Sequence, residues 1–179
     1  MNIRILIQED VTAYRTLRLQ ALHTNPEAFG ATYEDFAARS LSDIAERLRP
    51  KGDPLEGFTL GAFDDEGTLI GTITLQRQQY TKVRHQGTIT GMYVTPAARG
   101  QGVSRALLHQ AIAHALALPG LEQLHLMVVT TNVAAQRLYL SFGFEVCGRI
   151  RQAMKLDDTY WDEEAMVLYL KGYELAPLS

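Results

Sequence analysis

The segment from Thr88 to Val129 constrains the fold of this chain more than any other. Thr88–Val94 is β-branched and aromatic, as in a buried strand, and Pro96 ends it because proline has no N–H to donate to a sheet. Gly102–Leu118 has apolar residues at helical spacing, and Leu124–Val129 is a nearly continuous apolar run typical of a parallel strand covered on both faces. This order predicts a strand, helix, strand crossover and an α/β fold.

The turn between that strand and that helix is a candidate phosphate site. It reads Arg99-Gly100-Gln101-Gly102-Val103-Ser104. The first N–H groups of a helix have no helical acceptor and the helix dipole adds partial positive charge, so such a turn binds phosphate readily. Two common motifs do not fit: the P-loop needs Lys-Ser or Lys-Thr after its last glycine, and the dinucleotide fingerprint needs glycine where Arg105 stands.

A second motif follows at Asn132-Val133-Ala134-Ala135-Gln136-Arg137-Leu138-Tyr139-Leu140-Ser141-Phe142-Gly143-Phe144. It resembles the Asn-x-x-Ala-x-x-Leu-Tyr-x-x-x-Gly-Phe signature of the GCN5-related N-acetyltransferase (GNAT) superfamily. The glycine turn resembles the pyrophosphate loop of the same family, and it departs only at Ser104, where glycine or alanine is preferred. The element order from Ile3 to Leu170 is also similar, so the resemblance covers nearly the whole chain.

The resemblance implies a single mixed, mostly antiparallel sheet with a splayed central pair of parallel strands and helices on both faces, in one domain over residues 1–179. In the family, the pantetheine arm of acetyl-coenzyme A pairs with the central strand like an extra strand, so Met92 and Val94 would supply main-chain partners. The turn amides would hold the pyrophosphate, and Asn132 would bond the pantetheine. The implied cofactor contacts are Met92, Tyr93, Val94, Arg99, Gly100, Gln101, Gly102, Val103, Ser104, Arg105, Asn132, Ala135 and Tyr139.

The resemblance also implies acetyl transfer to a primary amine by direct attack in a ternary complex. The main-chain N–H of Met92 or its neighbour would donate to the thioester oxygen. Tyr139 is the expected general acid, because a phenol with a reference pKa of about 10 is still protonated when a thiolate forms.

The general base stays open, because Thr88–Val94 contains no Asp or Glu. Glu34 is our first catalytic candidate. Asp162, Glu163 and the more distant His85 are alternatives, and so is a water relay, especially for an α-amine, whose reference pKa of about 8 leaves a useful neutral fraction.

The remaining elements are predicted from periodicity and turn residues. They are an opening strand through Ile3, Ile5 and Ile7, a helix from Val11 to Leu22, helical periodicity over Thr32–Arg49, a hairpin of Phe58–Phe63 and Leu69–Leu75, a short helix over Ala134–Phe142, and strands at Phe144–Ile150 and Met166–Leu170 after the acidic stretch Asp157–Glu164.

Charge and cysteine content exclude several functions. The net charge of -3 leaves no basic surplus for nucleic acid or an anionic membrane, and no stretch approaches the roughly 20 apolar residues of a membrane span. Cys147 is the only cysteine, and the five histidines have no metal-ligand spacing. We therefore expect a cytoplasmic protein without a metal. The family resemblance implies a monomer or a homodimer.

The acceptor is expected to be a small-molecule amine, a peptide N-terminus or a lysine, and the acidic stretch Asp157–Glu164 suggests a cationic one. The alternative is a sensor module that binds acyl-coenzyme A without turnover, which the missing strand carboxylate favours. A nucleotide-binding domain of another family using the same turn is a third possibility.

Overall fold

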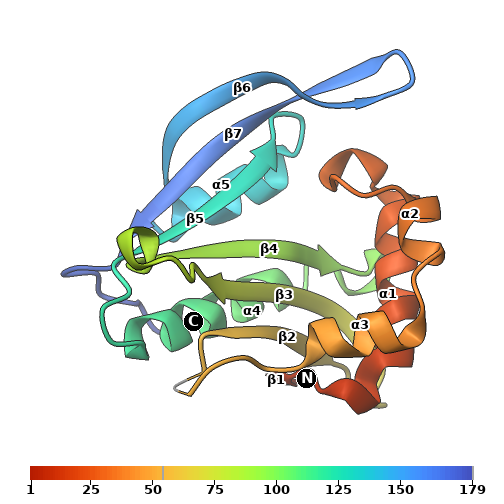
Figure 1. Cartoon of the computed structure of the whole chain (residues 1–179), viewed down its shortest axis with the longest axis horizontal. Helices are drawn as coiled ribbons and strands as arrows, with labels where there is room; N and C mark the ends of the chain where they lie inside the picture. Colours follow the sequence, from red (N-terminus) through yellow and green to blue (C-terminus); the bar gives the residue numbers. More distant parts are fainter. Residues whose placement is uncertain (54, 179) are drawn as a thin grey trace.

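The computed structural model of the chain describes residues 1–53 and 55–178. Its strands form one sheet in the order β1-β2-β3-β4-β5-β7-β6 (Figure 1). Only β4 and β5 are parallel, and every other neighbouring pair is antiparallel. The strands are β1 (Asn2–Ile5), β2 (Gly57–Phe63), β3 (Leu69–Arg77), β4 (Gln86–Val94), β5 (Gln123–Val129), β6 (Glu145–Leu156) and β7 (Thr159–Tyr169).

Helices cover both faces of the sheet. They are α1 (Val11–Thr24), α2 (Tyr33–Ala37), α3 (Leu41–Leu48), α4 (Val103–Ala117) and α5 (Val133–Ser141). The main core joins Leu107 and Leu108 of α4 to Leu60 and Ile73 of the sheet. A second cluster joins α1 and α3 to the opposite face through Leu17, Leu48, Phe63 and Tyr93, among others.

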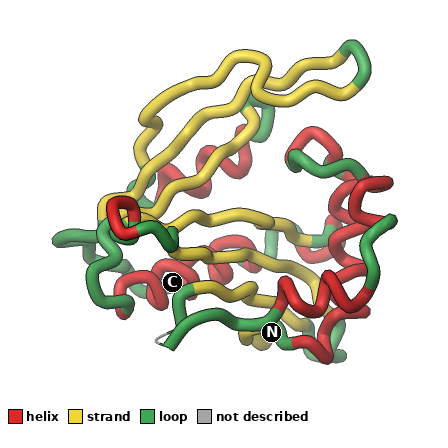
Figure 2. Tube along the Cα trace, viewed as in Figure 1, coloured by secondary structure: helices red, strands yellow, loops and turns green. Residues whose placement is uncertain are grey.

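The central parallel strands part soon after they meet. β4 and β5 pair only at Gln86↔Gln123, Gly87↔Leu124 and Thr88↔His125. Beyond these pairs β5, β7 and β6 rise away from β4, while α1 and α2 lie across the open end (Figures 1 and 2). The predicted fold, a mostly antiparallel sheet with a splayed central pair and helices on both faces, is confirmed.

A bulge shapes β4 at the place where the strands part. Thr72 and Thr74 of β3 pair with Tyr93 and Thr90 of β4. An advance of two residues along β3 therefore matches an advance of three residues along β4, which leaves one extra residue in β4. Gly91 lies in this bulge with φ +63°, a left-handed value that favours glycine. Thr72 Oγ1 donates to the Gly91 carbonyl at 3.2 Å and secures the bulge.

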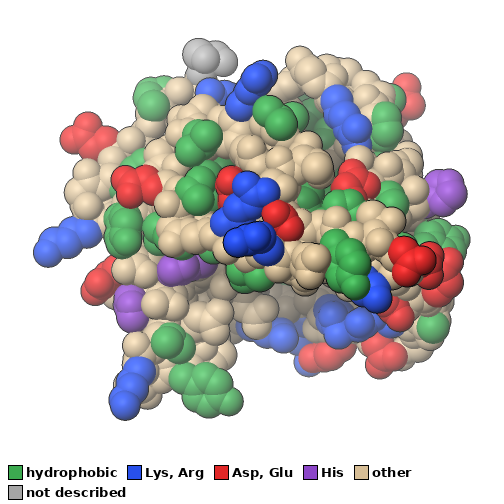
Figure 3. Space-filling model, turned by 90° about the horizontal axis from the view of Figure 1, so that it is seen from above, with side chains coloured by type: hydrophobic (Ala, Val, Ile, Leu, Met, Phe, Trp, Pro, Cys, Tyr) green, Lys and Arg blue, Asp and Glu red, His purple; other side chains and the backbone are tan. Residues whose placement is uncertain are grey.

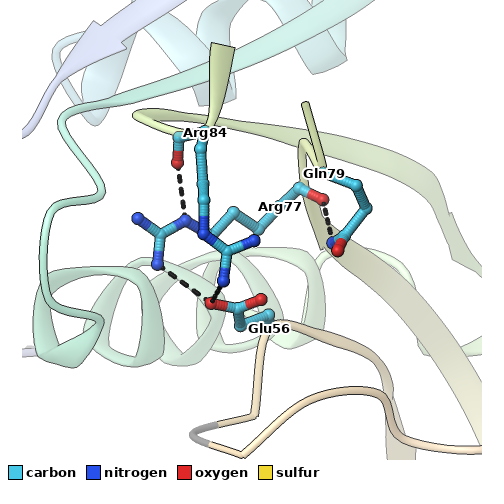
Figure 4. A network of polar contacts seen from close by, with 4 residues as sticks. All are labelled: Glu56, Arg77, Gln79 and Arg84. Carbon is cyan, nitrogen blue, oxygen red and sulfur yellow. Dashed lines mark hydrogen bonds and ion pairs between the residues drawn. The ribbon is translucent and has the colours of Figure 1, made fainter. Parts of the chain in front are cut away.

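An ion-pair network closes the opposite end of the gap (Figure 4). The Glu56 carboxylate accepts from Arg77 at 3.1 Å and from Arg84 at 2.6 Å. Arg77 Nε also donates to the Arg84 carbonyl at 2.6 Å. Since Glu56 precedes β2, Arg77 ends β3 and Arg84 precedes β4, the network ties three strand ends together.

Three sequence-based boundaries were wrong. The opening strand ends at Ile5, and Leu6, not Ile7, is the buried residue after it (0% against 45% exposed). The Thr32–Arg49 region is two helices, because Thr32 and Ser40 each accept a hydrogen bond from the backbone N–H three residues on and cap a separate helix.

The third wrong boundary concerns the end of the sheet. Most of the acidic stretch Asp157–Glu164 belongs to β7, which forms a long hairpin with β6. β6 is an edge strand and is exposed over most of its length, so neither strand shows the hydrophobic alternation by which half-buried strands are found.

Candidate functional site

A cleft of about 560 Å³ fills the gap between β4 and β5. It is lined by β4 from Ile89 to Val94, by the turn that begins α4, by Met127–Val129 at the end of β5, by residues of α5 up to Tyr139, and by residues after α1 from Asn25 to Phe29. The cleft therefore collects every cofactor contact expected from the sequence except Gln101, whose side-chain amide donates to the Ala97 carbonyl at 3.0 Å.

The glycine turn presents free amides to this cleft. Gly100 and Gly102 have φ of +77° and +78°, so both positions favour glycine for conformational reasons. The first hydrogen bond of α4 runs from Ala106 N–H to the Gly102 carbonyl at 2.9 Å, so the N–H groups of Val103, Ser104 and Arg105 precede the helical ladder. A Cβ built on either glycine would have no described atom within 4 Å, so the space before the turn is open.

Two polar residues fix the walls of the cleft. Arg99 donates to the Val94 carbonyl at 3.2 Å and to Asn25 Oδ1 at 2.8 Å, which ties the turn to the end of α1. Asn132 Oδ1 accepts from the Ala135 N–H at 3.1 Å, so Asn132 is the N-cap of α5. Its side-chain NH₂ group remains available for a ligand.

Tyr139 lies on α5 at the wall of the cleft and is only 6% exposed. Its hydroxyl has no hydrogen-bond partner among the described residues. Every fully buried side-chain N or O atom that the structure describes does have a partner, so this oxygen is not fully buried and opens on the cleft. Burial raises the pKa of Tyr139 to about 12. The phenol is thus protonated at neutral pH and able to donate a proton.

A larger cavity of about 1100 Å³ adjoins the cleft. Its walls come from the end of α1, the loop before α2, and the β6–β7 hairpin, with Leu22, Tyr33, Met154 and Trp161 among the lining side chains. Phe29 lines both cavities, so they meet at that ring. Glu34 lies on the wall of this larger cavity, not in the cleft, and its side chain is exposed.

The other candidate bases occupy different places. The main chain of His85 accepts from Glu122 and Gln123 at the paired end of β4 and β5, away from the cleft. Asp162 binds Arg149 at 2.8 Å and the Gln152 N–H at 2.8 Å, and these bonds hold the pKa of its carboxyl below the usual range. Glu163 is half-buried on β7, and burial raises the pKa of its carboxyl.

Sequence reasoning missed several lining residues. Asn25, Glu27 and Phe29 belong to the cleft, but Asn25-Pro26 appeared only as the end of a helix. A glycine inside a predicted strand is a known sign of a bulge, so Gly91 was detectable. Nothing in the sequence brings Trp161 to the larger cavity, because that contact depends on the sheet order.

Charge is mixed on the surface. Figure 3 shows Lys and Arg side chains interspersed with Asp and Glu on the face seen from above. Among the described residues, no three His, Cys, Asp or Glu side chains group in a way that could hold a metal ion. None of the helices within residues 1–53 and 55–178 has the length and apolar character needed to cross a membrane.

Comparison with known proteins gives a consistent result. The model of the acetyltransferase (GNAT) family matches residues 18–144. A mycothiol acetyltransferase of Thermobispora bispora is 36% identical over 143 residues, which are 75% of this chain and 43% of that protein. The chain thus spans less than half the length of this relative.

Solved structures share the fold over nearly the full chain. A probable acetyltransferase from Staphylococcus epidermidis has a TM-score of 0.75 at 25% identity. The superposition covers 94% of this chain and 98% of that chain. A putative acetyltransferase from Salmonella typhimurium, solved with acetyl-CoA, has a TM-score of 0.78 at 24% identity. The superposition covers 100% of this chain and 98% of that chain.

Proposed function

The chain belongs to the acetyltransferase (GNAT) family, and from this premise we propose that it transfers an acetyl group from acetyl-coenzyme A to a primary amine. The observation that carries the proposal is the cleft between β4 and β5, which joins free helix-start amides at one end to the Tyr139 phenol at the other. We further propose that the chain works as one domain. Its single cysteine fits a reducing, cytoplasmic compartment.

The cleft suits a diphosphate linked to an extended arm. The N–H groups of Val103, Ser104 and Arg105 would bind the pyrophosphate, aided by the dipole of α4. Arg105 stacks on Phe142, with 5.0 Å from its guanidinium carbon to the ring centroid, so its charge is held near the turn. Beyond Thr88, the edge of β4 that faces β5 has no strand partner among the described residues. Main-chain groups on this edge, including those of Met92, are therefore left for the pantetheine arm.

The reacting groups are assigned along the same cleft. A main-chain N–H beside Met92 would donate to the thioester oxygen and stabilise the charge that develops there. The acceptor nitrogen forms a bond to the acetyl carbon as the carbon–sulfur bond breaks. Tyr139 then gives its proton to the leaving sulfur. Burial raises the pKa of Tyr139 to about 12, so the phenol is still protonated at neutral pH when the thiolate forms.

We place the acceptor in the larger cavity. The two cavities meet at Phe29, which supports direct attack with both substrates bound. The walls are mainly apolar and aromatic, with Leu22, Met154 and Trp161, so they favour an amine on an apolar body. Within the acidic stretch, Asp162 is paired with Arg149, so this carboxylate adds little to the expectation of a cationic acceptor.

An acceptor screen tests this function. The chain is incubated with acetyl-coenzyme A and a panel of amines, and free thiol and acetylated amine are both quantified. We expect the two products in equal amounts, with apolar amines preferred. Tight binding of acetyl-coenzyme A in calorimetry, with no thiol released for any amine, would instead support the sensor module.

A further inference from the structure

Glu163 on β7 neighbours one lining residue of each cavity. On β5 it pairs with Val129, which lines the cleft, and on its own strand Trp161 lines the larger cavity two residues away. Side chains alternate along a strand, so Trp161 and Glu163 point to the same face. A registered cross-strand pair has Cβ atoms about 5 Å apart. The carboxylate thus points to the same side of the sheet as these two lining residues.

The neighbouring acids on β7 point to the other face. Asp162 is held there by Arg149 at 2.8 Å, and Glu164 is in register with the same arginine. The Glu163 side chain has no hydrogen bond or ion pair with any described residue. Since every fully buried side-chain N or O atom described has a partner, its carboxylate oxygens are not fully buried and are open to a ligand. Of these three carboxylates, that of Glu163 alone is both unpaired among the described residues and on the side of the sheet that faces the acceptor cavity.

The groups around Glu163 leave its charge available. Those on the packed strands β5 and β6 are His125, Glu145, Cys147, Arg149, Arg151 and Lys155. Those on the cavity walls are Lys155 again and His23, Glu27, Tyr33, Glu34, Tyr93, Arg99, Arg105 and Tyr139. Arg149 is engaged by Asp162. Burial lowers the pKa of His125, so that ring is neutral at neutral pH and adds no competing charge.

We propose that Glu163 is the catalytic residue that takes the proton from the ammonium group of the acceptor, an assignment that rests on the proposed acetyl transfer. The proton moves to the carboxylate as the neutral nitrogen attacks the acetyl carbon, and Tyr139 supplies the proton that the sulfur takes. Once bonded to the acetyl carbon, the nitrogen loses its second proton, which restores the Tyr139 phenol, and Glu163 releases the first proton to solvent. Partial burial raises the pKa of the Glu163 carboxyl, which makes this carboxylate a stronger base than an exposed one.

Two amine probes separate this role from a structural one. Phenethylamine has an ammonium pKa near that of lysine, about 10, whereas phenylalaninamide resembles an α-amine with a pKa of about 8. Without a base the amine must lose its proton to water before it binds productively. Glu163→Gln should therefore slow phenethylamine acetylation at pH 7 by roughly 100-fold and phenylalaninamide acetylation by much less.

The controls are chosen from the same region. Glu164→Gln changes an identical side chain on the opposite face of β7 and should leave both rates within about twofold, as expected for a conservative change away from the site. Glu163→Asp keeps the carboxylate and should retain more activity than Glu163→Gln. Affinity for acetyl-coenzyme A, measured by calorimetry, should be the same in all three variants, which shows that they fold.

The possible outcomes are distinct. Equal rate losses for the two amines in Glu163→Gln, or none, would overturn the assignment while leaving acetyl transfer intact. So would a selective loss for phenethylamine in Glu34→Gln with none in Glu163→Gln, since Glu34 would then be the base. If the unmodified chain binds acetyl-coenzyme A but acetylates neither amine nor any other in the panel, the proposed function fails and Glu163 fails with it.

Discussion

Thr88 on β4 and His125 on β5 form the last pair that joins the two parallel strands. Beyond this pair β5 rises away from β4 (Figure 1), Gly91 forms a bulge in β4, and the space between the strands becomes the cleft that Tyr139 lines. The end of the pairing after Thr88 therefore provides both the unpaired strand edge and the room for a ligand.

Replacing Tyr139 with phenylalanine tests the proposed acid. Tyr139→Phe removes the proton donor from a buried position, so kcat should fall about 100-fold or more, the usual contribution of acid catalysis. The rate at which free thiol is released from acetyl-coenzyme A measures this change in kcat. Tyr173→Phe is the matched control, because its hydroxyl donates to the Phe142 carbonyl at 2.8 Å outside the cleft. Equal rates for Tyr139→Phe and the unmodified chain would remove Tyr139 from the mechanism.

The same phenol should make stability fall at high pH. Its folded pKa of about 12 lies above the ordinary tyrosine value of 10.0, so the folded state holds the proton more tightly. That contribution is complete below pH 10 and is lost as the pH rises toward about 12, by on the order of 3 kcal/mol. Urea unfolding at several pH values should show a steeper alkaline loss for the unmodified chain than for Tyr139→Phe. Parallel curves would contradict it.

The Glu56 network should contribute to stability more than to chemistry. Glu56→Gln leaves Arg77, which is 7% exposed, without its charged partner, and breaking a buried pair in this way costs about 3–5 kcal/mol. Chemical denaturation should show this loss in the free energy of unfolding. Glu66→Gln, in the exposed turn between β2 and β3, should change it by less than about 0.5 kcal/mol. Equal stabilities for the two variants would mean that the network is not stabilising.

The fold could be predicted further than the site. The glycine turn and the Asn132–Phe144 motif contain local signals, and their elements appear where expected. Phe29 and Trp161 meet in the larger cavity, with Glu163 two residues from Trp161 on the same face of β7, only through the order β4-β5-β7 and the splay of the sheet, which no local pattern contains. The β6–β7 hairpin was misjudged for a related reason, since an exposed edge strand buries no regular face.

Trp161 should determine how well apolar acceptors bind. Trp161→Ala removes an aromatic wall of the larger cavity, and losing burial of that size costs about 1.5–3 kcal/mol, or a 10- to 100-fold rise in KM for phenethylamine. Affinity for acetyl-coenzyme A should not change. Tyr169→Ala, an exposed aromatic on the same strand, serves as the control. An unchanged KM in Trp161→Ala would place the acceptor elsewhere.

The central claim is that the amides after Arg99 bind a pyrophosphate while Tyr139 faces the sulfur at the other end of the same cleft. A crystal structure with coenzyme A tests it most directly. We expect the pyrophosphate on the N–H groups of residues 102–105 and the phenol oxygen of Tyr139 within hydrogen-bonding reach of the sulfur. A pyrophosphate bound away from this turn, or a phenol turned away from the sulfur, would contradict the account.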